Sequence, residues 1–389
     1  MHAYLRYALE RQEEIAALIQ RLVEAESPSD SPESVDHVMD LLIEVNRDVA
    51  QAEVVPSPRF GKHLKLTFGG SGKSQSRQLL AIGHADTVWP LGTLRQMPFR
   101  KEEGRLWGPG VLDMKSGLVI FLYAMRLLRE MKIAVNCPVV LLVVSDEEVG
   151  SPDSRPLTEA EGRKSRAAFI LEPGTGLSGK LKTARKGVGR YLIRVEGVAA
   201  HAGVDFQAGA SAIVEAAHQI QEVAKLSDRA LGVTVNPGVV RGGTRSNVVA
   251  ASAEIEVDVR AVTESDARQV GERLSKLQAL DPRCRISVEG GPNRPPMERN
   301  SKIAALFESA REVGREIGLE LEESATGGGS DGNFTAALGI PTLDGLGAVG
   351  EGAHAVTESV LLERIPERIA LLAGLISRVS SEHVGSRFA

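Results

Sequence analysis

Short apolar runs that end in acidic or histidine residues recur along the first half of the chain. The run at Val139–Val144 is too short for an ordinary helix and lacks polar alternation, so it predicts a strand buried on both faces. Residues 79–82 and 169–171 have the same character, whereas the apolar stretch at 118–131 is long enough for a helix. Strands that alternate with helices in this way indicate an α/β sheet covered on both faces.

The stretch before Leu79 predicts fewer elements. Its pattern indicates a helix at the N-terminus, a loop at SPSDSPES, a second helix near 35–49, a strand at His63–Phe68 and a Gly/Ser turn at 69–75. The first 24 residues alternate charged and apolar side chains without a continuous apolar core. We therefore expect neither a signal peptide nor a membrane span there.

A different pattern begins after Glu172. It predicts, in order, a strand at 189–196, a helix at 208–226, strands at 233–240 and 253–259, a helix at 264–280 and a strand at 285–288. The order β-α-β-β-α-β is the ferredoxin-like arrangement. Glycines and prolines at 290–296 then end the pattern, and helix-strand alternation resumes from Ser301. We expect a domain inserted at 187–292 into a host made of 1–186 and 293–389; the alternative is one long α/β sheet.

Composition narrows the class of protein. A chain of 389 residues, 42% hydrophobic and 25% charged, buries a large core and is expected to form two domains. A net charge of −5 and a pI near 6.0 give no reason to expect a nucleic-acid partner. Cys137 and Cys284 form no disulfide framework, so reduced thiols in the cytoplasm are expected.

Three acids, Asp146, Glu147 and Glu148, directly follow the Val139–Val144 run. Ligands of open α/β sheets bind at the carboxyl ends of the strands. Two adjacent glutamates on an irregular segment point in different directions, so one can hold a metal while the other moves a proton. The alternative is a solvated acidic turn.

Further side chains that bind divalent cations lie at strand ends or in loops. These are His84, Asp113, Glu172 and His354. Asp86, two residues after His84, is placed to orient its ring. Taken singly, each histidine could be an ordinary histidine and each carboxylate an ordinary surface acid. The irregular separations between them exclude a zinc finger. Two histidines and three carboxylates, with Glu148 included, together predict a site for divalent ions that the fold must assemble.

Eight motifs, in order along the chain, carry a family resemblance: GHADTV, GVLDMKSG, SDEEVGS, ILEPG, AAHAG, RSNVV, TGGGSDG and GAH. Together they resemble the M20 metallopeptidases, and most of all the glutamate carboxypeptidase branch. The resemblance runs from about Leu79 to the C-terminus, and the stretch before it matches only loosely.

The resemblance implies a dizinc site, with Co²⁺ or Mn²⁺ as possible substitutes. His84 and Glu172 would bind one zinc, and Glu148 and His354 the other. Asp113 would bridge the two, followed by a cis bond to Met114. Glu147 would be the general base, and Asp86 would orient His84.

The resemblance also gives roles to the inserted domain, which resembles a lid through which the protein forms a homodimer. His201 in AAHAG would stabilise the oxyanion in the partner's active site. Asn247, Arg260, Lys180, Arg294 and Gly329 would contact substrate. From the residues alone, an ordinary surface role is the alternative for each of them: the two arginines and Lys180 would be solvated cations, and Asn247 a surface hydrogen-bonding group. Gly327–Gly329 would be either an anion-binding segment or a flexible turn. Residues 183–186, TARK, add two cations to the branch's pattern and leave the acyl preference open.

The expected function is therefore hydrolysis of an amide bond in a peptide or N-acyl amino acid, with release of a C-terminal amino acid, glutamate first. One alternative is an N-acyl-amino-acid deacylase with the same metal ligands. Another is a non-catalytic binding protein that keeps the fold. The presence of Glu147 favours an enzyme, because a binding protein would not need the base.

Overall fold

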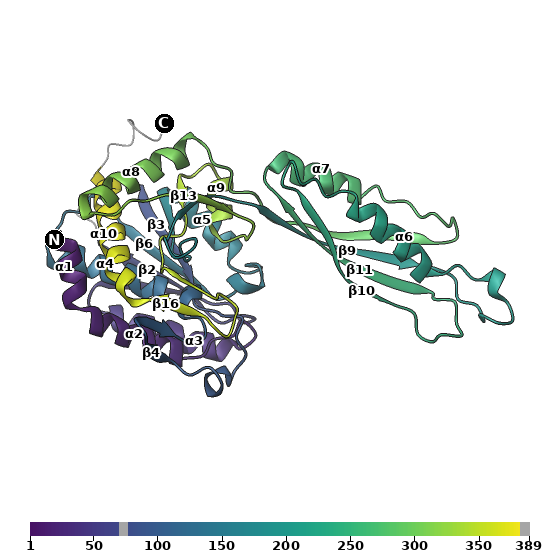
Figure 1. Ribbon diagram of the computed structural model, residues 1–389, viewed down its shortest axis with the longest axis horizontal. Helices are drawn as coiled ribbons and strands as arrows, with labels where there is room; N and C mark the ends of the chain where they lie inside the picture. The colour runs from purple at the N-terminus through teal and green to yellow at the C-terminus, as the bar shows by residue number, and fades with distance from the viewer. Residues whose placement is uncertain (70–76, 382–389) are drawn as a thin grey trace. The chain divides into compact units, whose positions relative to one another are not determined.

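The structure, a computed structural model, describes residues 1–69 and 77–381 (Figure 1). The predicted turn at 69–75 lies, apart from Gly69, outside these residues. The chain divides into two compact units. Unit 1 comprises Met1–Ala184, Arg299–Ala325 and the segment from Ser330, and unit 2 comprises Arg185–Glu298 and Thr326–Gly329. Within the described residues, no helix has the length and apolar character needed to cross a membrane.

A six-stranded mixed sheet forms the centre of unit 1, in the order β1-β2-β6-β3-β7-β14. Its strands are β1 (Ala50–Val55), β2 (His63–Phe68), β3 (Gln78–His84), β6 (Val139–Val144), β7 (Ser165–Ile170) and β14 (Thr342–Leu343). β3, β6, β7 and β14 run parallel to one another, whereas β2 is antiparallel to both of its neighbours, β1 and β6. All six residues of β6 are buried, as the uniformly apolar run predicts.

Helices cover both faces of this sheet. Alternate side chains of its central strands point to opposite sides, and because both sets are apolar, each face packs against helices. In β3, Leu79 and Ala81 join the larger core, and Leu80 and Ile82 join a smaller one on the other face. The helices of the larger core are α1 (Ala3–Glu10), α2 (Gln12–Glu24), α3 (Pro32–Asn46), α4 (Ser116–Glu130), α8 (Ser301–Ile317) and α10 (Ile365–Ser381). The other face is covered by α5 (Arg155–Lys164) and α9 (Gly332–Ala337). The α/β class predicted from the pattern is confirmed.

Two smaller sheets complete unit 1, and the sequence pattern did not predict them. One has the order β15-β16-β5-β4 and consists of β4 (Arg100–Glu102), β5 (Arg105–Trp107), β15 (Gly350–Glu351) and β16 (Ser359–Leu361). The other pairs β8 (Leu181–Arg185) with β13 (Glu323–Thr326). The loop between β15 and β16 carries His354 and Glu358, so this sheet positions part of the site described below.

Unit 2 has the predicted ferredoxin-like order, β9-α6-β10-β11-α7-β12. Its elements are β9 (Gly187–Glu196), α6 (Ala212–Ala224), β10 (Thr234–Gly242), β11 (Ser252–Ala261), α7 (Glu264–Leu274) and β12 (Arg285–Arg294). The strands form one antiparallel sheet with the order β10-β11-β9-β12. This sheet is separate from the sheets of unit 1, so the alternative of one long sheet is wrong.

The two largest differences from the predicted boundaries in unit 2 are at the ends of β12 and α7. β12 continues through Gly290, Gly291 and Pro292 to Arg294, because it is an edge strand in which proline leaves no ladder hydrogen bond unmade. α7 ends at Leu274 instead of continuing to 280. The Glu215 carboxylate accepts hydrogen bonds from the N–H groups of Leu280 and Asp281, which gives that backbone non-helical partners.

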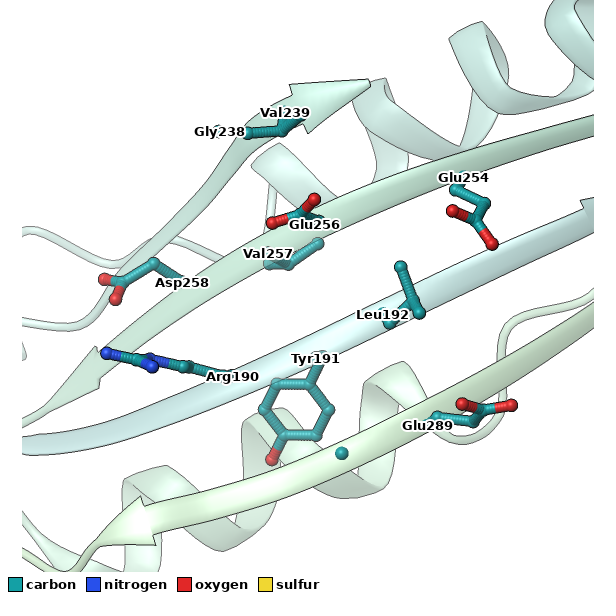
Figure 2. A pocket seen from close by; sticks show the side chains of 11 residues that line it. Arg190, Tyr191, Leu192, Gly238, Val239, Glu254, Glu256, Val257, Asp258 and Glu289 are labelled. Carbon is teal, nitrogen blue, oxygen red and sulfur yellow. The ribbon is translucent and has the colours of Figure 1, made fainter. Parts of the chain in front are cut away.

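One face of the unit 2 sheet packs on α6 and α7, while the other carries charged side chains. Arg190, Leu192, Glu254 and Glu256 line a shallow hollow on that face (Figure 2). Its acids are in ion pairs: Glu254 lies 2.9 Å from Arg194, and Glu256 pairs with Arg241. We therefore interpret this face as a solvated, self-neutralised surface and not as a ligand site.

Candidate active site

The carboxyl ends of three neighbouring parallel strands meet at one edge of the unit 1 sheet. His84 is the last residue of β3 and is paired with Val144, the last residue of β6. Glu147 and Glu148 follow β6, and Glu172 follows β7 on the other side of β3. The parallel register thus gathers residues that are far apart in sequence.

His84 is buried, and its two ring nitrogens have different neighbours. Nδ1 lies 2.9 Å from the backbone carbonyl of Asp86 and 3.5 Å from its carboxylate. Nε2 lies 3.1 Å from Asp113 Oδ1 and 3.7 Å from Glu172 Oε1. Because the Asp86 carbonyl can only accept, Nδ1 carries a proton and Nε2 faces the two carboxylates as a potential ligand.

The Asp86 carboxylate has a further role that the sequence did not indicate. It accepts hydrogen bonds from the N–H groups of Glu147 (3.2 Å) and Glu148 (3.1 Å) and from Ser29 Oγ (2.7 Å). Its main partners are therefore in the loop after β6. Asp86 links the segment of His84 to the segment that carries the two glutamates.

Asp113 lies between the two histidines. Its Oδ2 is 3.3 Å from His354 Nε2, while its Oδ1 faces His84. The Asp113–Met114 peptide bond is cis, as the resemblance implied. The nearby Gly117 has no space for a side chain, because a Cβ there would lie 2.1 Å from the carbonyl oxygen of Leu171. This glycine lets the start of α4 lie directly against the end of β7.

His354 reaches Asp113 from the loop between β15 and β16. Its φ of 62° is left-handed, and Gly352 before it has φ 80°. Its Nε2 also lies 3.4 Å from Glu148 Oε2. His354, Glu148 and Asp113 form one group of potential ligands, and His84, Glu172 and Asp113 form another, each with its ligand atoms within 4.8 Å of one another.

The residues of these groups fit a pair of divalent cations. Each group offers one imidazole and two carboxylates, counting the shared Asp113, and zinc binds such mixed N/O sets. The Oε1 atom of Glu148 is buried and has no hydrogen-bond partner among the described residues. A buried carboxylate oxygen without a partner is costly, and a bound cation would remove that cost.

The carboxylates also set the charge state of the histidines. Hydrogen bonds to Asp113 and then to Glu148 raise the pKa of His354 to about 10. Burial opposes the charged form of His84, but hydrogen bonds to Asp113 and Asp86 outweigh it and raise the pKa of His84 well above its usual value. Burial raises the pKa of Glu148. The site thus attracts positive charge, and a metal ion would replace these protons.

A buried carboxylate that the sequence analysis missed, Glu358, holds the loop of Asp113. It is fully buried and accepts hydrogen bonds from the N–H groups of Gly110 (2.9 Å), Leu112 (2.8 Å) and Asp113 (3.1 Å). The indole N–H of Trp89 donates a fourth, of 2.8 Å. Burial raises the pKa of Glu358. One carboxylate thus fixes the backbone that presents the shared ligand.

Two predicted substrate residues of unit 2, Arg294 and Arg260, lie beside Gly327–Gly329, a segment that contains a third, Gly329. A Cβ on Gly329 would lie 2.7 Å from Arg294 Cδ, so a side chain there would force Arg294 to shift. Arg260 pairs with Asp258 and lies 3.5 Å from the carbonyl of Gly327. Arg185, which the prediction did not include, donates to the carbonyls of Gly328 and Gly329 at 3.1 and 3.0 Å. Three guanidinium groups therefore surround one glycine segment.

His201 and Asn247 also lie together in unit 2. His201 forms an isolated bridge with Val248, and the N–H of Ala202 donates to the Asn247 carbonyl at 3.0 Å. The N–H of Gly203 donates to His201 Nδ1 at 3.1 Å. A neutral imidazole that accepts at Nδ1 carries its proton on Nε2, so the exposed His201 presents a donor.

Lys180, another predicted substrate residue, belongs to unit 1. Lys180 closes a turn with Thr175 and forms an ion pair of 2.5 Å with Glu322 in unit 1. Both side chains are largely exposed, and such pairs contribute little to stability. The substrate contact suggested by its spacing from Glu172 stays a prediction, and in this structure the Lys180 ammonium is paired with Glu322.

The fold and the paired ligand groups define a class of enzyme, the metal-dependent peptidases and amidohydrolases. The particular family follows from comparison with known proteins. The family described as Peptidase family M20/M25/M40 matches residues 80–378, and the chain belongs to it. The resemblance inferred from the eight motifs is thus confirmed, and members of this family typically depend on a dinuclear metal centre.

Similar proteins differ in substrate. The chain is 30% identical over 309 residues to carboxypeptidase G2 from Pseudomonas sp. (strain RS-16), an alignment that covers 77% of this chain and 73% of that protein. It is 28% identical over 322 residues to a succinyl-diaminopimelate desuccinylase from Dechloromonas aromatica (strain RCB), covering 76% and 82%. The crystal structure of aminopeptidase PepT from Bacillus cereus ATCC 10987 matches with a TM-score of 0.76 at 22% identity, over 95% of this chain and 99% of that one, and supports the fold.

Proposed function

We propose that the protein hydrolyses the amide bond of a peptide or N-acyl amino acid and releases the C-terminal amino acid, with glutamate preferred. The observation that supports this most directly is that Asp113 belongs to both ligand groups. The segment after β6 that carries the ligand Glu148 also carries Glu147, which can act as a base. Two zinc ions would be held by His84 with Glu172 and by Glu148 with His354, with Asp113 shared. Co²⁺ or Mn²⁺ would be possible substitutes.

The proposed reaction needs few protein groups. When bound, the two ions supply Lewis-acid polarisation of the scissile carbonyl and a water of lowered pKa. Glu147 takes a proton from the attacking water and delivers it to the leaving amine, so that the C–N bond breaks and a carboxylic acid and an amine result. Asp86 keeps Glu147 in place through the hydrogen bond to its N–H group.

We assign His201 to the oxyanion. Its Nε2–H is free to donate because Nδ1 accepts from Gly203, and a donor aimed at the developing charge lowers the barrier. We propose that this histidine acts in the active site of a second copy, in a homodimer formed through unit 2. The two free thiols, Cys137 and Cys284, suit a reducing compartment, and we propose a cytoplasmic location.

The glutamate preference rests on the guanidinium groups around Gly327–Gly329. An arginine fork binds a carboxylate with two parallel hydrogen bonds, and Arg294, with Arg260 nearby, would hold the carboxylates of the released residue. Asn247 would add an amide contact, and Gly329 its N–H group. Lys180 is engaged with Glu322, so we give it at most a minor part.

Steady-state kinetics test this preference with N-acetyl-glutamate and N-acetyl-leucine. We expect a higher kcat/KM for the glutamate substrate, and Arg294→Ala should weaken its binding by about 2 to 5 kcal/mol with metal content unchanged. Arg283→Ala, an exposed arginine of unit 2 paired with Asp281, is the matched control and should leave both substrates unaffected. Equal kcat/KM for both substrates, unchanged by Arg294→Ala, would overturn the glutamate preference.

The second candidate function is that of a deacylase with the same metal ligands. The desuccinylase from Dechloromonas aromatica, aligned over a similar share of the chain, favours keeping it. A deacylase selects the acyl group and tolerates different amines. A panel in which the acyl group and the amino acid are varied separately distinguishes the two functions, because the proposed carboxypeptidase prefers glutamate with every acyl group, whereas a deacylase accepts different amino acids.

A further inference from the structure

A cavity of about 540 Å³ lies in unit 1 and includes none of the predicted metal ligands in its lining. Its walls come from two segments that directly follow such ligands. Trp89 and Pro90 come shortly after His84, and Val356 is two residues after His354. Its volume is within the usual range of small-molecule pockets, roughly 300 to 1,000 Å³.

Hydrogen bonds connect the cavity wall to the shared metal ligand. Trp89 Nε1 donates to Glu358 Oε2 at 2.8 Å, and the N–H of Asp113 donates to Glu358 Oε1 at 3.1 Å. The indole ring and the Asp113 backbone are thus fixed to the same buried carboxylate. The cavity therefore adjoins the candidate metal centre.

The segment that follows Trp89 along the chain is also held in place. The carboxylate of Glu26 accepts hydrogen bonds from the N–H groups of Gly92 (2.8 Å) and Leu94 (2.9 Å). The N–H of Met97 donates to the Thr93 carbonyl at 2.9 Å. These bonds fix the segment from which most of the lining comes, so the cavity is formed before any ligand binds.

The lining selects for an uncharged, apolar group. Five of its eight residues are apolar, and none is acidic. Val356, the one lining residue from the loop after His354, is 75% exposed, so its isopropyl group is accessible to a ligand in the cavity. The one charged lining residue, Arg100, lies 2.9 Å from Glu102 and has its guanidinium 5.2 Å from the centre of the Trp107 ring.

We propose that this cavity binds the acyl side of the substrate and that the enzyme favours large apolar acyl groups over small or anionic ones. This inference rests on the proposed amide hydrolysis and adds to it the identity of the group on the carbonyl side of the scissile bond. An acyl chain held there gains contact with Trp89 and Val356 while its carbonyl remains near Asp113. The cavity would then set the acyl preference that the cations of residues 183–186 leave open.

Three substrates that differ only in the acyl group test the proposal: N-acetyl-, N-hexanoyl- and N-succinyl-glutamate. A buried methylene improves binding about fourfold, so four partly buried methylenes should raise kcat/KM for the hexanoyl substrate about 10-fold or more over acetyl. Val356→Asp should abolish this advantage. Val54→Asp, the same change at an exposed valine of β1, is the control and should preserve the advantage. Equal turnover of hexanoyl and acetyl substrates, or faster turnover of succinyl, would overturn the proposal.

A binding measurement separates this inference from the proposed function. Calorimetry with the Glu147→Gln protein gives Kd for the same three compounds whether or not they are cleaved. Tighter binding of the hexanoyl compound that Val356→Asp weakens would support the cavity even if no amide were hydrolysed. Equal Kd values for the hexanoyl and acetyl compounds would refute the cavity even if both amides were hydrolysed.

Discussion

Replacement of Glu358 by glutamine removes one acceptor from the group that holds the Asp113 loop. Glu358 Oε1 accepts from Leu112 and Asp113, and Oε2 accepts from Gly110 and Trp89. Glutamine has the same shape but only one oxygen. Whichever way the amide is turned, its NH₂ group faces two N–H donors.

The cost follows from the number of donors left without an acceptor. Each buried N–H that loses its acceptor costs about 1 to 3 kcal/mol, so two of them lower the free energy of unfolding by about 2 to 6 kcal/mol. The loss also loosens the backbone that presents Asp113. Outer partners of metal ligands typically contribute 10- to 100-fold in metal affinity, and we expect Glu358→Gln to weaken zinc binding by roughly that factor.

Two measurements test this prediction. Urea unfolding of the metal-free protein is followed by tryptophan fluorescence, because Trp89 and Trp107 are the two tryptophans of the chain and both lie in unit 1. Zinc affinity is measured by competition with a chromophoric chelator. Glu351→Gln, at a half-exposed residue of the same hairpin that pairs with Arg105, is the control and should cost less than about 1 kcal/mol. Wild-type stability and wild-type zinc affinity in Glu358→Gln would refute the reasoning.

Three further predictions concern other parts of the chain. Glu147→Gln should keep two metal ions per chain, measured by elemental analysis, and lose several orders of magnitude in kcat, whereas Glu148→Gln should lose metal; equal metal loss in both would contradict the assigned roles. Mixing inactive His201→Ala chains with inactive Glu147→Gln chains should restore some activity, because one hybrid site has both groups intact, and no recovery after demonstrated subunit exchange would mean that His201 does not act in the partner. Burial would raise the pKa of Glu161, but hydrogen bonds, led by the one from Lys164, lower it below its usual 4.5. Its stabilising effect is therefore present above pH 4.5 and lost as the pH falls through the lower folded value. Glu161→Gln should unfold more readily than wild type at pH 7, by a difference that shrinks as the pH falls below 4.5; a difference that does not change with pH would contradict this.

The gathering of the candidate ligands at one sheet edge was predictable because strand ends can be recognised in the sequence. A uniformly apolar run marks β6, and its abrupt end places Glu147 and Glu148 at the sheet edge where β3 delivers His84. Parallel strands share that edge, so the grouping of distant residues follows from the fold class. The sequence shows which residue types meet there; the distances between their atoms depend on the loops.

Glu358 could not be predicted in this way. Its partners are mainly backbone N–H groups, which every residue except proline provides, so its role leaves no pattern of side chains. β12 passes through Gly290 and Pro292 because it lies at a sheet edge, and edge position is a property of the assembled sheet. The turn that carries Lys180 to Glu322 is likewise set by the pairing of β8 with β13.

The assignment of Thr326–Gly329 to unit 2 bears on how this protein can be dissected. Unit 2 is built from two segments of the chain, Arg185–Glu298 and this short one, which the host sequence supplies. Deleting the long segment alone would remove the hydrogen bonds that Arg185 donates to the carbonyls of Gly328 and Gly329. Grafting that segment alone onto a relative would pair it with the relative's own segment in place of Thr326–Gly329. Unit 2 is therefore a discontinuous module, and a chimaera designed to exchange it must transfer both pieces together.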